Sequence, residues 1–121
     1  MLKKVLVVED EQLIGLMLAE EIRHMGYEVT AVVSNGQAAV QAVQHNPPDA
    51  VLMDISLPGV LDGIETARII KDERNIPILF FTGHHHGRQL LDRIRTVCPV
   101  GIINKLDSPE NIRAALASLL R

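Results

Sequence analysis

The sequence predicts a doubly wound α/β fold, with one five-stranded parallel sheet and five helices that cover both of its faces. Five short apolar segments alternate along the 121 residues with five segments that have the apolar period of a helix. The short segments are almost continuously apolar, which is typical of strands covered on both faces. Strict alternation of strand and helix favours parallel pairing and right-handed crossovers. We therefore expect one domain, 1–121, around a single sheet.

The first strand is predicted over 4–8, where four consecutive apolar residues lie between charged ones. A helix is predicted over about 11–25, because apolar residues recur on one stripe and charges on the other side. Gly26 ends this helix, since glycine tolerates positive φ beyond a helix end. Met17 and Met25 are interpreted as core residues of the stripe, not as part of a cofactor site.

The second strand is predicted over 28–33, a segment rich in β-branched residues. Either Ser34 or Asn35 can cap the helix that follows, because both side chains accept hydrogen bonds from a first helical turn. That helix extends to about His45 and ends before Pro47, since the residue before a proline avoids helical geometry.

The second half of the chain repeats this alternation. The remaining strands are predicted over 50–53, 78–82 and 102–104, and the remaining helices over 63–73, about 88–96 and from 109 to the end. Ser108-Pro109 is a strong helix start, with a capping residue followed by proline at the first helical position. We expect the flavodoxin-like strand order 2-1-3-4-5, which places strands 4–8 and 50–53 together where the order reverses.

Composition excludes several functions. The net charge is −3, with twelve basic and fifteen acidic residues interspersed, so no basic footprint indicates direct nucleic-acid binding. The aromatic residues Tyr27, Phe80 and Phe81 are too few to stack single-stranded bases. No apolar run approaches the length of a membrane span or of a signal peptide. A lone cysteine, Cys98, agrees with a reducing compartment, and a cytoplasmic protein is expected.

The residues that follow the predicted strands form a set with a chemical meaning. In a parallel sheet, Glu9 and Asp10, Asp54, Thr82, and Lys105 all come to the edge formed by the carboxyl ends of the strands. Three carboxylates placed together repel one another, and a hard divalent cation such as Mg²⁺ relieves the repulsion. Asp54 alone could simply cap a turn. The whole set instead indicates a metal site formed by Glu9, Asp10 and Asp54.

The same edge can hold a phosphoryl group. Lys105 supplies a positive charge, Thr82 a hydroxyl donor, and Asp54 a carboxylate that can attack phosphorus. The resulting aspartyl phosphate is a reactive mixed anhydride, which suits a transient signal. Glu11 is interpreted only as a favourable charge at the start of a helix.

These motifs resemble the receiver domains of two-component response regulators, and the resemblance covers essentially the whole chain. In receivers an acidic pair closes the first strand, and an aspartate closes the third before a loop with Pro-Gly and Asp-Gly. A Thr or Ser and a Lys close the fourth and fifth strands. The corresponding residues are Glu9 and Asp10, Asp54, Thr82 and Lys105.

The resemblance implies a function. Asp54 would accept phosphate from a phosphohistidine on a sensor histidine kinase or a histidine phosphotransfer protein, and conformational change of the surface would signal to an output protein or domain. Asp10 would bind Mg²⁺ directly, Glu9 mainly through water, and the Ser56 carbonyl would be a further ligand. Phosphotransfer and dephosphorylation would be self-catalysed, without a metabolic reaction. A homodimer would use the face formed by the helix at 88–96, the strand at 102–104 and the last helix.

The sequence departs from the family pattern at four places. Ile102 stands where receivers usually carry an aromatic switch residue, and Leu106 stands where a proline commonly follows the lysine. The loop 57–62 is one residue longer than the commonest form. The three adjacent histidines 84–86 are interpreted as a solvated loop and not as a transition-metal site, although His84 would lie near the phosphoryl group by analogy.

Three alternatives compete with the phosphorylation switch. A degenerate receiver would act as a docking module without phosphorylation, and Ile102 and Leu106 keep that hypothesis open. A Mg²⁺-dependent phosphatase with an aspartyl intermediate is disfavoured, because such enzymes usually carry an acid where this chain has Ser56. A nucleotide-binding role is weaker still, because no Gly-rich phosphate motif follows the first strand.

Overall fold

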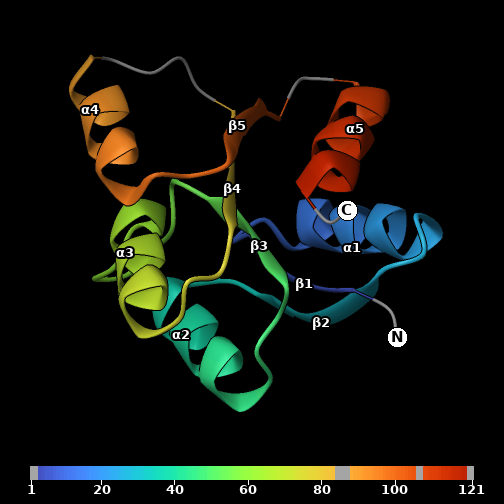
Figure 1. The fold of residues 1–121 in the computed structure, drawn as a ribbon, viewed down its shortest axis with the longest axis horizontal. Coiled ribbons are helices and arrows are strands. Elements are labelled where there is room, and N and C mark those ends of the chain that lie inside the picture. Colours follow the sequence, from blue (N-terminus) through green and yellow to red (C-terminus); the bar gives the residue numbers. More distant parts are fainter. Residues whose placement is uncertain (1–2, 84–87, 106–107, 120–121) are drawn as a thin grey trace.

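The computed structural model describes residues 3–83, 88–105 and 108–119, and its sheet has the predicted topology (Figure 1). The five strands are Lys4–Val8 (β1), Glu28–Val33 (β2), Ala50–Asp54 (β3), Ile78–Thr82 (β4) and Gly101–Asn104 (β5). They pair in parallel in the order β2-β1-β3-β4-β5. The prediction of fold and strand order is confirmed. β1 and β3 are therefore central neighbours, with Val8 opposite Met53.

Five helices lie in two layers. They are Gln12–His24 (α1), Gly36–His45 (α2), Gly63–Glu73 (α3), Arg88–Val97 (α4) and Pro109–Leu119 (α5). Figure 1 shows α1 and α5 on one side of the sheet, and α2, α3 and α4 on the other. Each layer covers one face, as the crossover rule requires.

Two apolar clusters fill the space between sheet and helices. In β1, Leu6 and Val8 belong to the cluster beneath α2, α3 and α4, whereas Val5 and Val7 belong to the cluster beneath α1 and α5. Successive side chains of a strand point to opposite faces, so β1, β2, β3 and β4 contribute to both clusters, whereas β5 contributes Ile103 to the cluster beneath α1 and α5. The continuous apolar runs of the sequence follow from this double burial.

The observed helix starts explain some of the sequence signals. Asn35, one of the two predicted caps, accepts a 2.8 Å hydrogen bond from the backbone N–H of Ala38. Ser108 accepts a 3.3 Å bond from the N–H of Asn111, as its predicted capping role requires. α3 is capped by Asp62, whose carboxylate accepts a 2.9 Å bond from the N–H of Glu65.

Two predictions need correction, one on the end of a strand and one on a core residue. β3 includes Asp54, which pairs with Phe81 and so belongs to the ladder. Met17 is not a core residue, because it is 63% exposed, whereas Met25 packs against the cluster beneath α1. Sequence spacing places Met17 beside the apolar stripe of α1, but only one face of α1 packs on the sheet, and Met17 lies outside that face.

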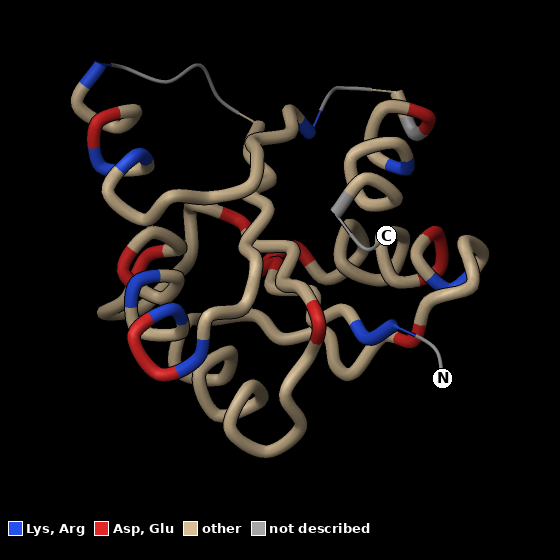
Figure 2. Tube along the Cα trace, viewed as in Figure 1, with Lys and Arg blue, Asp and Glu red and all other residues tan. Residues whose placement is uncertain are grey.

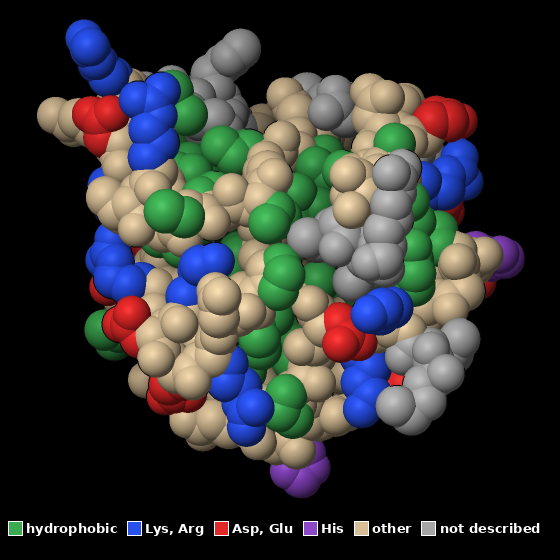
Figure 3. Space-filling view, in the orientation of Figure 1, with side chains coloured by type: hydrophobic (Ala, Val, Ile, Leu, Met, Phe, Trp, Pro, Cys, Tyr) green, Lys and Arg blue, Asp and Glu red, His purple; other side chains and the backbone are tan. Residues whose placement is uncertain are grey.

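The surface agrees with the composition. Blue and red positions are mixed along α1, α3, α4 and α5 in Figure 2, as expected for a chain with interspersed charges, whereas α2 carries neither. Apolar side chains gather through the middle of the face seen in Figure 3, between the helices on its left and right. Within the described residues, every helix is too short or too polar to cross a membrane.

Candidate functional site

The carboxyl edge of the sheet gathers the predicted residues. Asp54 ends β3, Glu9 and Asp10 follow β1, and Lys105 follows β5. One carboxylate oxygen from each of Glu9, Asp10 and Asp54 lies within 4.8 Å of the others. This contact arises because β1 and β3 are adjacent and parallel, so that residues far apart in the chain end at the same edge.

Lys105 joins the two buried carboxylates. Its ammonium donates to Glu9 Oε1 at 3.0 Å and to Asp54 Oδ2 at 3.1 Å. It also lies 5.7 Å from the centroid of the Phe81 ring, within range of a cation–π interaction. The backbone N–H of Lys105 donates to the Thr82 carbonyl at 2.7 Å, which attaches this segment to β4. The lysine is thus held by backbone and side chain.

A cleft of about 320 Å³ opens above these groups. Its lining residues are Asp10, Glu11, Asp54, Ser56, Gly83 and Lys105. Two predicted site residues, Glu9 and Thr82, are buried and do not belong to this lining, at 2% and 3% exposure. The backbone N–H of Ser56 donates to Asp54 Oδ1 at 3.1 Å, so the loop after β3 orients the carboxylate.

Burial changes the acidity of the central groups. Desolvation, together with repulsion from Asp54, raises the pKa of Glu9 to about 7, although Lys105 opposes the shift. The pKa of Asp54 is also raised, chiefly by burial, and again Lys105 opposes the shift. Burial acts to lower the pKa of Lys105, but its hydrogen bonds to Glu9 and Asp54 prevail and raise it. The lysine therefore stays charged while the carboxylates compete for it.

One buried oxygen of this cluster lacks a donor. Lys105 Nζ is 3.0 Å from Glu9 Oε2, but only Oε1 meets it with hydrogen-bond geometry, and Oε2 accepts no hydrogen bond among the described residues. An unpartnered buried carboxylate oxygen is costly. The atoms available to bind a metal here are the oxygens of three carboxylates and of an adjacent backbone loop. Oxygen ligands are the ones that a hard cation such as Mg²⁺ prefers. The residues present fit such an ion.

Sequence reasoning missed three features of the site. Gly63 packs directly on the backbone of Asp54, and a Cβ at this position would overlap the Asp54 carbonyl oxygen and lie 2.7 Å from the Cα of Ile55. The sequence predicts only a helix-start role for Glu11, yet its carboxylate lies 3.7 Å from Lys105 Nζ. Phe81 lies beside Lys105. The Asp62-Gly63 pair signals a turn in the sequence, but sequence spacing does not show that Gly63 contacts the backbone of Asp54.

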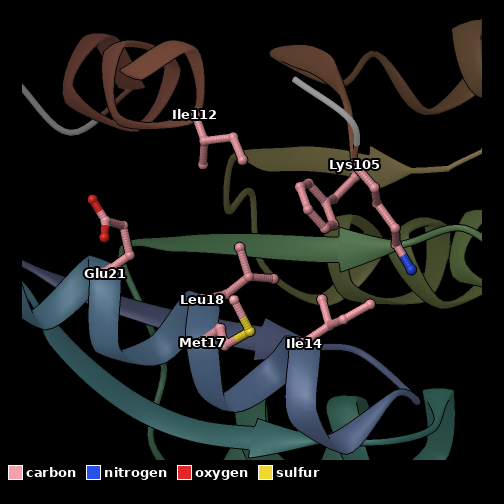
Figure 4. Close-up of a pocket in the computed structure, with 7 residues that line it drawn as sticks. Ile14, Met17, Leu18, Glu21, Lys105 and Ile112 are labelled. Atoms are coloured by element: carbon pink, nitrogen blue, oxygen red, sulfur yellow. The ribbon is translucent and has the colours of Figure 1, made fainter. Parts of the chain in front are cut away.

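A second cavity adjoins the site between α1 and α5. It measures about 260 Å³, and its apolar lining includes Ile14, Leu18 and Ile112. Figure 4 shows Glu21 and Lys105 at opposite ends of this cavity. Glu21 Oε1 also accepts a 2.6 Å hydrogen bond from Arg113 of α5, so an ion pair bridges the two helices there.

Some sequence-based expectations lie outside the described residues. They concern the histidines 84–86 and Leu106. Ile102, in contrast, is described, and its side chain on β5 is 40% exposed.

Comparison with known proteins supplies an independent line of evidence. The family model of the response regulator receiver domain matches residues 5–117. Over 93 residues the chain is 40% identical to the transcriptional regulatory protein PdtaR of Mycobacterium tuberculosis, a match that covers 77% of this chain and 44% of that protein. The uncharacterized transcriptional regulatory protein YrkP of Bacillus subtilis is 36% identical over 120 residues, which cover 98% and 49% of the two chains. The chain thus spans about half the length, or less, of these curated relatives.

Solved structures show the same similarity. The signal receiver domain of a modulated diguanylate cyclase from Desulfovibrio desulfuricans superposes with a TM-score of 0.90 at 32% identity, covering 99% of this chain and 94% of that chain. The chemotaxis protein CheY4 of Vibrio cholerae superposes with a TM-score of 0.89 at 25% identity, covering 99% and 100%. Both similarities extend over the whole sheet and its helices.

Proposed function

Because the chain belongs to the response regulator receiver domain family, we propose that it is a phosphorylation switch in which Asp54 accepts a phosphoryl group in a Mg²⁺-dependent reaction. One observation carries the proposal: Asp54 lies buried at the sheet edge, in contact with Lys105 and close to two further carboxylates. A structural ion pair needs only one acid. Three acids around one base, with a Glu9 oxygen that has no hydrogen-bond partner within residues 3–83, 88–105 and 108–119, suit a site that takes up a cation and an anion together.

In the proposed reaction, a carboxylate oxygen of Asp54 attacks the phosphorus of a phosphohistidine. The phosphorus–nitrogen bond breaks, and the histidine leaves with its electron pair while an acyl phosphate forms on Asp54. Lys105 offsets charge on the phosphoryl oxygens, and the Thr82 hydroxyl donates to one of them. Bound Mg²⁺, held by Asp10, Glu9, Asp54 and the Ser56 carbonyl, would supply further positive charge there.

The signal ends by hydrolysis at the same site. A water molecule attacks phosphorus, the bond to the Asp54 oxygen breaks, and inorganic phosphate leaves the regenerated carboxylate. The cleft beside Asp54 and Ser56 provides access for that water. Because both steps use groups of this chain, the switch is its own phosphotransfer and dephosphorylation catalyst and not a metabolic enzyme.

The proposal includes the chain's partners. We expect residues 1–121 to act as one receiver domain that takes phosphate from a sensor histidine kinase or a histidine phosphotransfer protein in the cytoplasm. The signal would pass to an output protein or domain, with the α4, β5 and α5 face as the surface for a homodimer. Apolar exposure at Ile102 of β5 and at nearby Val100 supports the use of this face in protein contacts.

A docking module that never carries phosphate is the second candidate. The observation that favours it is Ile102, which stands in place of the family's usual aromatic switch residue and is half-exposed. A module of this kind would use the same surface but would not depend on Asp54.

Incubation with Mg²⁺ and acetyl phosphate separates the two candidates. Intact-protein mass spectrometry should show the gain of one phosphate, with no gain in Asp54→Ala or in the presence of a chelator. Asp72→Ala is the matched control, because Asp72 is an exposed carboxylate on α3, and it should behave as the parent. Absence of any gain in the parent would reject the phosphorylation switch and favour the docking module.

A further inference from the structure

Helix α4 is attached to α3 by polar contacts in addition to apolar packing. Arg93 Nη2 lies 2.7 Å from Asp62 Oδ2, and it is 3.7 Å from a carboxylate oxygen of Glu65. Further along the same two helices, Arg68 Nη2 donates to Thr96 Oγ1 at 2.9 Å. These contacts form a seam that begins at the first turn of α3.

Asp62 is also part of the support beneath the phosphoacceptor. Its Oδ1 accepts the 2.9 Å bond from the Glu65 N–H that caps α3, so each carboxylate oxygen has its own partner. Its neighbour Gly63 has no room for a side chain against the Asp54 carbonyl, and the Gly63 N–H donates to the Ile55 carbonyl at 2.8 Å. The start of α3 and the end of β3 therefore form one closely packed unit.

The rest of α4 is attached by few side chains. Ile94 and Val97 are the residues of α4 that are buried, and Leu90 and Leu91 are partly buried against the same cluster. Tightly packed interiors shift between discrete arrangements, and a helix with a small apolar contact is the easier element to shift. Because Arg93 contacts Asp62, this ion pair connects α4 directly to the backbone segment that packs on Asp54, whereas the other contacts of the seam lie along the helices.

We propose that Arg93 is a positioning residue that couples α4 to the phosphoacceptor site through Asp62. Metal or phosphate at Asp54 and the position of α4 then depend on each other, because coupling between two sites is reciprocal. The phosphate part of this inference rests on the proposed function, whereas the metal part does not. Asp62 remains charged for this role: burial acts to raise its pKa, but the Glu65 N–H and Arg93 outweigh burial and lower it.

Hydrogen exchange of α4 amides tests the coupling. The protein is measured without ligand, with Mg²⁺, and with Mg²⁺ plus acetyl phosphate, while intact mass reports phosphate on Asp54. In the parent we expect each ligand to change exchange in α4. In Arg93→Gln, exchange without ligand should be about two- to fivefold faster, as expected for loss of a partly exposed ion pair, and the response of α4 to ligand should be lost.

Two further variants separate coupling from simple destabilisation. Asp62→Asn keeps an oxygen that can cap α3 but removes the charge, so it should behave as Arg93→Gln does. Arg95→Gln makes the same substitution on α4 at a side chain that is 79% exposed and paired with Asp92 of its own helix, and it should retain the full response. Arg93→Lys should restore part of it.

The outcomes decide between the inference and its failure. If α4 in Arg93→Gln still responds to ligand as the parent does, or if α4 in the parent responds to neither ligand, the coupling is rejected. If the parent gains no phosphate, the proposed function fails, and the Mg²⁺ measurements alone decide the coupling.

Discussion

At the scale of single residues, Glu9 has the least favourable environment in the site. It is 2% exposed, shares Lys105 with Asp54, and has one oxygen that accepts no hydrogen bond from the part of the chain that the structure describes. Its pKa of about 7, raised mainly by burial, reflects this position. In the absence of metal, a proton on Glu9 is the simplest way to relieve the repulsion with Asp54.

This raised pKa predicts how stability depends on pH. Between about pH 4.5 and 7 the folded state keeps the Glu9 proton that the unfolded chain has lost, so folding takes up a proton and stability falls as pH rises. Glu9→Gln removes the contribution of Glu9 to this pH dependence. With chelator present, the variant should exceed the parent in free energy of unfolding by about 1 to 3 kcal/mol at pH 8, with little difference at pH 4.5.

Urea denaturation at several pH values measures the effect. Glu28→Gln is the control, because Glu28 is exposed at the start of β2 and its replacement should shift the curves little. A Glu9→Gln variant that is less stable than the parent at pH 8 would contradict the inference that the buried charge of Glu9 destabilises the fold.

At the scale of elements, the site depends on how α3 begins. Asp62 caps the helix, and Gly63 lets its first turn contact the backbone of Asp54. A sequence signal for a turn, Asp-Gly, was therefore also a packing requirement. β3 and α3 act as one support for the phosphoacceptor because neither can move without disturbing that contact.

Gly63→Ala should destabilise the protein. In a helix alanine is better than glycine by up to about 1 kcal/mol, but here its Cβ would overlap main-chain atoms that cannot yield without moving β3. We expect a net loss of about 1 to 3 kcal/mol in the free energy of unfolding, measured by urea denaturation.

Gly83→Ala provides the matched control for this substitution. A Cβ at Gly83 would lie 3.5 Å from Lys105 Cδ, an ordinary contact, so stability should change little. Equal stability of Gly63→Ala and the parent would show that the contact between α3 and β3 can relax.

At the scale of the whole molecule, the site lies where the strand order reverses. After β1 the chain continues into α1 on one side of the sheet, and after β3 it continues into α3 on the other side. The carboxyl ends of these two neighbouring strands are therefore open to a ligand. β1 supplies Glu9 and Asp10, and β3 supplies Asp54. A ligand bound there links distant parts of the chain and should therefore stabilise the entire fold.

Mg²⁺ should raise the melting temperature. At a concentration one hundred times its dissociation constant, a ligand of the folded state adds about 2.7 kcal/mol, which corresponds to roughly 10 °C for a domain of this size. The shift should shrink as pH falls below about 7, because protons compete with metal at Glu9.

Differential scanning calorimetry with Mg²⁺ and with chelator measures this shift. Asp10→Asn should abolish most of it, whereas Asp92→Asn, a substitution of an exposed acid on α4, should not. An equal shift in Asp10→Asn would place the metal elsewhere.

The architecture and the residue composition of the site could be predicted from the order of amino acids alone. Alternation of short apolar runs with helical periods leaves few ways to bury both faces of a parallel sheet, so strand order and the positions of Asp54 and Lys105 at one edge could be predicted. The helix caps Asn35 and Ser108 could be predicted because a cap bonds to residues that follow it closely in the chain.

The contacts that these groups make depend on tertiary packing and could not be predicted in the same way. The burial of Glu9 Oε2 without a hydrogen-bond donor in the described parts of the chain depends on how the elements pack. The approach of Glu11 to Lys105 and the ion pair of Arg93 with Asp62 join residues that are far apart in the chain. Their distances depend on how helices pack on the sheet, a property that periodicity does not encode. Exposure of Met17 follows from the same cause, since the rotation of α1 about its axis is set by packing.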